Sequence, residues 1–130
     1  MNYERLRGHP PDFEIRYRMY TVEEGGRKLG SPWQHYRCDW AYEGDDVQDS
    51  GVYMIHPEFI NYCGEILPEG ESVPMSGLAT MWIVVPKMRA MHQTRIHEGV
   101  KGYFMEGSRK IGEAVVTKVI ALGTNPSEVT

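Results

Sequence analysis

The sequence has 130 residues, of which 41% are hydrophobic and 25% are charged, and its formal net charge is −4. This length and composition predict a single folded domain over residues 1–130 and exclude a disordered chain and a general nucleic-acid-coating protein, which needs a basic field. The charges are segregated: residues 38–80 hold nine Asp and Glu and no Lys or Arg, so any basic patch must come from the two ends of the chain.

The sequence predicts a cytoplasmic protein that does not enter a membrane. No apolar run approaches the length of a membrane span, and no charged-then-apolar leader opens the sequence. Cys38 and Cys63 could pair in an oxidising compartment, but we expect two reduced thiols. Cys38 lies on the aromatic face of its predicted strand, where a buried and inert thiol is expected.

The first third of the chain predicts an extended arm followed by two strands. Residues 1–11 contain paired prolines that favour the extended arm. Residues 12–20 alternate apolar and polar side chains and predict a strand, which ends in a charged turn with two glycines at residues 23–28. Residues 35–42 predict a second strand, with Tyr36, Cys38, Trp40 and Tyr42 on its aromatic face.

The middle of the chain is acidic and aromatic over residues 43–65. Residues 52–60 predict a short strand that Pro57 confines to a sheet edge or a bend. Residues 79–85 predict a strongly apolar strand. Residues 87–97 show no clean period, which leaves either a bulged strand or a long connection.

The last part of the chain predicts a hairpin over residues 100–122, closed by a tight turn at residues 106–109. The tail at residues 123–130 is polar and is expected to fray. Strands at short spacing, with Gly and Pro turns between them and no clear amphipathic helix, predict an all-β fold, an antiparallel barrel of about six strands.

Several short motifs along the chain occur in the order found in a known protein family. They are Phe13–Glu14, Glu23 to Arg27, Tyr36–Arg37, Leu67 to Gly70, Glu98 to Val100, Glu106 to Arg109, Gly112, and Val115 to Lys118. In order and approximate spacing they resemble the third, C-terminal domain of translation elongation factor Tu, over about residues 12–122. In that family the domain is a β-barrel without catalytic residues that helps bind aminoacyl-tRNA and packs against a GTPase domain. Here no Gly-rich phosphate loop is present, and residues 43–65 are an insertion relative to the family.

The resemblance implies RNA contacts at Arg27 and Lys28 in the first turn, and at Glu106 and Gly107 in the second. Arg109 gives the second turn an arginine too. Guanidinium groups form paired hydrogen bonds with phosphate, and glycine N–H groups allow a close approach. The alternative is that both turns are solvated loops whose glycines serve only backbone geometry.

The sequence predicts neither a metal site nor a cofactor. His92 and His97 lie five residues apart, a spacing that matches none of the usual zinc patterns. The acidic residues 43–49 lack the twelve-residue loop of a calcium site.

These observations predict a non-catalytic binding module for a translation-related RNA or protein, with tRNA or a translation-associated protein as its partner. One alternative is a small-molecule-binding barrel or an enzyme that uses residues 43–65 as a pocket wall, with His56, Glu58 and Cys63 as its polar groups. Another is a homo-oligomer joined through the apolar side chains of residues 43–65. These side chains are either an exposed interaction patch or an added core layer.

Overall fold

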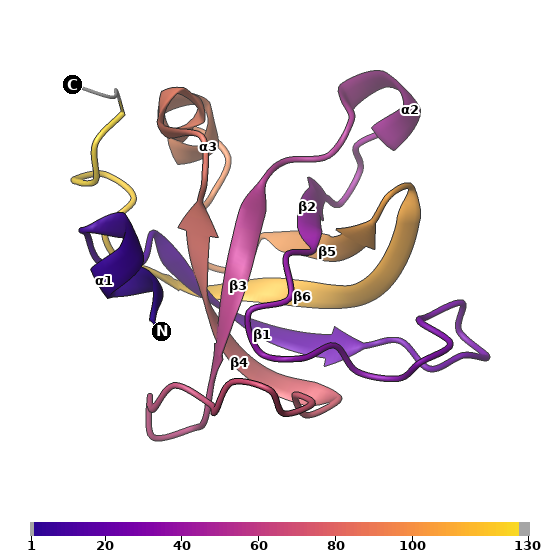
Figure 1. Ribbon diagram of the computed structural model, residues 1–130. Helices are drawn as coiled ribbons and strands as arrows, with labels where there is room; N and C mark the ends of the chain where they lie inside the picture. Colours follow the sequence, from indigo (N-terminus) through magenta and orange to yellow (C-terminus); the bar gives the residue numbers. More distant parts are fainter. Residues whose placement is uncertain (1, 128–130) are drawn as a thin grey trace.

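The fold is a six-stranded antiparallel sheet that curls into a half barrel, seen in a computed structural model that describes residues 2–127 (Figure 1). The strands are β1 (Phe13–Met19), β2 (Asp39–Tyr42), β3 (Ile55–Ile60), β4 (Ser76–Ile83), β5 (Lys101–Glu106) and β6 (Arg109–Val119). Their order across the sheet is β2-β5-β6-β1-β4-β3. The predicted all-β, antiparallel, barrel-like fold is confirmed.

The curl brings the two ends of the sheet together. Trp40 in β2 and Tyr53, just before β3, exchange two backbone hydrogen bonds of 2.9 and 2.8 Å. The enclosed space is an apolar core to which every strand contributes. Ile55 and Phe59 are fully buried in it, whereas Met54 and Tyr62 are exposed. The apolar side chains of residues 43–65 are therefore divided between the core and the surface.

Short helices, which the sequence did not predict, lie before the first strand and between strands. Residues 1–11 contain α1 (Tyr3–Arg7), because the Asn2 side chain accepts a hydrogen bond from the Arg5 N–H and caps the helix. Helix α2 (Val47–Ser50) lies between β2 and β3. These elements have only four or five residues, too few to show a helical period in the sequence.

Residues 87–97, predicted as a bulged strand or a long connection, belong to the connection between β4 and β5, which contains η1 (Pro86–Met88) and α3 (Arg89–Gln93). Pro86 takes a first position in η1, where its missing N–H costs nothing. Arg89 and His92 are three residues apart and are both buried, so they form the inner face of α3.

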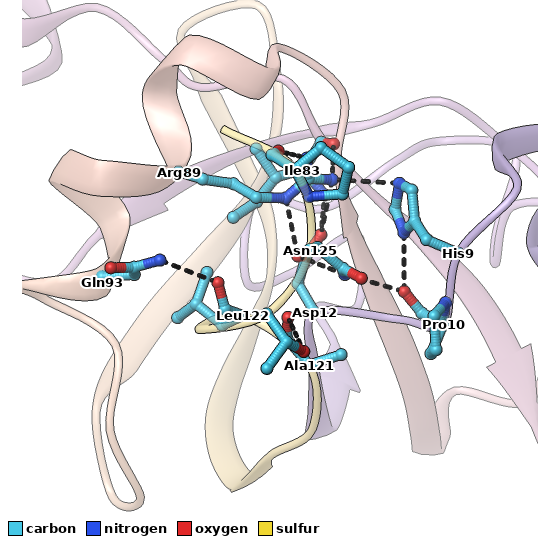
Figure 2. A network of polar contacts seen from close by, with 11 residues as sticks. His9, Pro10, Asp12, Ile83, Arg89, Gln93, Ala121, Leu122 and Asn125 are labelled. Atoms are coloured by element: carbon cyan, nitrogen blue, oxygen red, sulfur yellow. Dashed lines mark hydrogen bonds and ion pairs between the residues drawn. The ribbon is translucent and has the colours of Figure 1, made fainter. Parts of the chain in front are cut away.

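A buried polar network joins the N-terminal segment, α3 and the C-terminal segment (Figure 2). Arg89 donates from Nε to Asp12 Oδ1 at 2.8 Å and from Nη2 to the Ile83 carbonyl at 3.1 Å. Asn125 donates to the Pro10 carbonyl and to Asp12 Oδ1, both at 2.9 Å. We call this network the clasp. The tail is therefore ordered at Asn125, contrary to the expected fraying, while residues 128–130 lie outside the described residues.

Candidate functional site

The two glycine-containing turns that the sequence predicted as binding sites lie against each other. Arg27 donates from Nε to Glu106 Oε2 at 3.0 Å, although the two residues are 79 positions apart. The Arg27 guanidinium also stacks over the Tyr36 ring, 4.8 Å from its centre, and the Tyr36 hydroxyl donates to Glu106. We call this cluster the joint, and the surface formed by residues 24–28 and 106–109 the tip surface.

The joint is a half-buried arrangement with the side chain of Arg27 only 14% exposed. Burial and the hydrogen bond to Glu106 raise the pKa of Tyr36 to about 12, so its hydroxyl stays protonated and continues to donate. A second Arg27 nitrogen, Nη1, donates to the Gly30 carbonyl at 3.2 Å. The joint therefore fixes the first turn both to the second turn and to its own loop.

The first turn depends on a glycine. A Cβ on Gly26 would lie 2.2 Å from the Tyr20 carbonyl oxygen, and the Gly26 N–H donates to the Thr21 carbonyl at 2.8 Å. Beside it, Glu24 pairs with Arg18 at 2.8 Å. The hydrogen bond from Arg18, together with the Thr21 N–H, lowers the pKa of Glu24 to about 2, so this carboxylate is ionised and already occupied at neutral pH.

The five predicted binding residues fall into two groups. Arg27 and Glu106 form the joint and offset each other's charge. Lys28, Gly107 and Arg109 are exposed. Within residues 2–127, neither Lys28 nor Arg109 makes an ion pair or a side-chain hydrogen bond, so both cations face solvent.

His56, Glu58 and Cys63, the polar groups of the alternative small-molecule site, do not lie together. His56 and Glu58 are buried on β3, whereas Cys63 is exposed in the turn that follows. His56 Nε2 lies 3.8 Å from Asp39 Oδ1, while Glu58 faces a different set of partners. No contact within residues 2–127 joins the three side chains.

Glu58 belongs to a buried cluster beneath α1 that the sequence did not reveal. Its Oε2 accepts from the Tyr3 N–H at 2.9 Å and lies 2.7 Å from His35 Nε2. His35 has a left-handed backbone, with φ of 68°, and its Nδ1 lies 2.9 Å from Glu69 Oε1. This backbone turns the ring between two carboxylates. The cluster anchors α1 to the outer face of β3, and no local pattern predicts it because its members are far apart in sequence.

The remaining candidate residues are structural. Burial lowers the pKa of His56 and of His92 to about 4, so both rings are neutral at pH 7. His92 Nδ1 lies 2.6 Å from the Tyr42 hydroxyl, and His97 is exposed elsewhere. Burial also raises the pKa of the Cys38 thiol. In the part of the chain that the structure describes, no group of His, Cys, Asp and Glu is arranged to hold a metal ion.

A groove of about 450 Å³ crosses β4, β1, β6 and β5 on the outer side of the sheet. Its lining includes Arg16, Lys101, Tyr62 and Tyr103. Lys101 and Tyr103 lie two residues apart on one face of β5, whereas Arg16 is on β1 and Tyr62 follows β3, so the cross-strand register brings these segments together.

Comparison with known proteins adds no assignment: no protein-family model matches the sequence, and no curated protein matches it. Among residues 2–127, every helix is too short or too polar to cross a membrane.

Proposed function

We propose that this protein is a non-catalytic binding module of the cytoplasm that resembles the C-terminal domain of elongation factor Tu and recognises a translation-related RNA, with tRNA as the first candidate. The observation that carries the proposal is the joint. It holds two turns, which the resemblance links separately to RNA contact, side by side in one tip surface.

The charges of the tip surface support an anionic partner. Glu106 is engaged by Arg27, and Glu24 by Arg18, so their carboxylates are already compensated. Lys28 and Arg109 have no such partner within the described residues and can neutralise phosphates. Because phosphates neutralised by Lys28 and Arg109 release their counterions, we expect binding that weakens as salt concentration rises.

The proposal is tested with the double variant Lys28→Glu/Arg109→Glu. Both side chains are exposed, so the fold is expected to survive, whereas Arg27→Glu would place two carboxylates together in the joint. The dissociation constant for tRNA is measured by fluorescence anisotropy across a salt series. We expect the variant to bind at least about tenfold more weakly and its salt slope to fall by about two.

The matched control is Arg5→Glu/Lys87→Glu, which reverses one arginine and one lysine that are equally exposed on α1 and η1. It changes the net charge by the same amount, so equal losses in both variants would show that only the overall field matters, and the tip surface would be rejected as the site.

The class of partner is tested by a pull-down from a source lysate, with recovered RNA and protein both identified. Recovery of tRNA by the wild type and its loss in Lys28→Glu/Arg109→Glu would support the proposal. Recovery of a protein without RNA, or of the same RNA by both forms, would contradict it.

A further inference from the structure

The groove on the outer face of the sheet has no role in the proposed function, which uses the tip surface. The register places Arg16 of β1 opposite Val115 of β6, and Val115 opposite Lys101 of β5. Neighbouring strands are about 4.8 Å apart, so the backbones of Arg16 and Lys101 are separated by about 10 Å. Their long side chains rise on either side of Val115 and can reach one phosphate group between them.

The Glu113 carboxylate, in the next cross-strand row of the groove, is already paired with other side chains. Arg18 Nε lies 3.3 Å from Glu113 Oε1, and the Tyr20 hydroxyl donates to Glu113 Oε2 at 3.0 Å. By contrast, Arg16 and Lys101 make no ion pair or side-chain hydrogen bond within residues 2–127.

Arg18 is paired with both Glu24 and Glu113, so the charge that the groove can offer a ligand is that of Arg16 and Lys101. Two neighbouring cations that are not paired within residues 2–127 favour an anionic ligand.

Aromatic rings stand toward the two ends of the groove. Tyr62 follows β3, beside β4, and is 76% exposed. Tyr103 lies on β5, and Lys110 Nζ sits over its ring, 4.0 Å from the centre, so this end of the groove offers a cation. A flat ligand group can stack on the exposed Tyr62 ring while an anionic group lies between the two ends.

We propose that this groove binds a short single-stranded nucleic-acid segment, a phosphodiester with an adjoining base. The phosphate lies on Arg16 and Lys101, and the base stacks on Tyr62. A basic groove with aromatic platforms is the general means of holding single strands, and about 450 Å³ is within the range of ligand sites. This site uses none of the tip residues and does not depend on the proposed function.

The test measures binding of a fluorescent single-stranded RNA of about eight adenosines, the length of a typical single-strand site. We expect Arg16→Glu/Lys101→Glu to weaken binding at least about tenfold, with Arg5→Glu/Lys87→Glu as the matched control. Tyr62→Ala should weaken binding by about tenfold and Tyr62→Phe should retain it, because stacking needs the ring and not the hydroxyl. Tyr62 is exposed, so neither change threatens the fold.

Three results would overturn the inference: no binding of the single strand, equal binding of the matching RNA duplex, or competition by inorganic phosphate as effective as that by the single strand. Unchanged binding by Tyr62→Ala would also overturn it. The tip variant Lys28→Glu/Arg109→Glu should bind the single strand normally. If Arg16→Glu/Lys101→Glu binds the single strand as tightly as the wild type, the groove is rejected as the site and the proposed function is untouched. Loss of tRNA binding by the tip variant is a separate result that tests only the tip surface.

Discussion

Arg89 is 1% exposed, and its charge is met by Asp12, which is fully buried. Removing one member of such a pair leaves the other charge buried and uncompensated. We expect Arg89→Met to lower the free energy of unfolding by about 3–5 kcal/mol, as measured by chemical denaturation. Arg109→Met, at an exposed arginine, should change it by less than about 0.5 kcal/mol. Similar values for the two variants would show that the clasp does not stabilise the fold.

The buried histidines make stability depend on pH. Burial lowers the pKa of His56 and His92 to about 4, below the value of about 6.5 that applies in the unfolded chain. Between these pKa values the unfolded chain binds protons that the folded chain does not. The contribution of the two neutral histidines to the free energy of unfolding is therefore fully present above pH 6.5 and is lost as the pH falls toward 4.

We therefore expect His56→Gln to reduce the slope of unfolding free energy against pH between pH 4 and 6.5, as measured by denaturation at several pH values. His97→Gln, at an exposed ring, should leave the slope unchanged. A slope in His56→Gln as steep as that of the wild type would exclude His56 as a source of the pH dependence.

Strand β5 can pack against the buried Trp40 ring only because Gly102 has no side chain. Its absent Cβ would overlap the buried ring of Trp40. We expect Gly102→Ala to lower the midpoint of thermal unfolding strongly, with a loss of at least about 2 kcal/mol from overpacking. Gly123→Ala has open space and should be nearly neutral. An unchanged unfolding midpoint in Gly102→Ala would show that β5 or the Trp40 ring can move to accommodate the methyl group.

The free edge of β3 is completed by a side chain. Gln34 Nε2 donates to the carbonyls of Phe59 and Leu67 at 2.7 and 3.0 Å, and the Phe59 N–H donates to Gln34 Oε1 at 2.9 Å. The amide thus replaces a neighbouring strand and protects the edge.

We expect Gln34→Ala to cost about 1–3 kcal/mol and to speed hydrogen exchange at the Phe59 amide, because buried backbone groups lose their partners. Gln48→Ala, at an exposed position in α2, is the control and should change neither quantity. Unaltered exchange at Phe59 in Gln34→Ala would show that other contacts protect this edge.

The elements that the sequence predicted best are those with a complete period. The alternation of β1 and the last hairpin needed only local information, and so did the burial of Cys38, just before β2, and of Trp40 in β2. Helices α1 and α3 were missed because five residues do not establish a helical period.

The candidate sites show the same limit. Glycines and charges marked the two turns in the sequence, but the contact between Arg27 and Glu106 depends on how distant segments pack. The row of Arg16 and Lys101 depends on strand register, which the sequence does not state. His35 was predicted on a strand, and its left-handed backbone places it instead between two carboxylates.

The interior of the half barrel is an apolar core, while Lys28, Arg109, Arg16 and Lys101, which have no ion-pair partner among residues 2–127, all lie outside it. The clasp ties the two ends of the chain together on one side (Figure 1, Figure 2). Both proposed binding sites therefore lie on the outer surface of the half barrel.

Contact between the tip surface and RNA is tested by the change in the amide NMR spectrum when tRNA is added to the whole protein. We expect the perturbed amide signals to be those of residues 24–28 and 106–109, and the signals of α1 and α3 to be unchanged. No perturbation, or perturbation centred on α1 and the cluster beneath it, would contradict the claim.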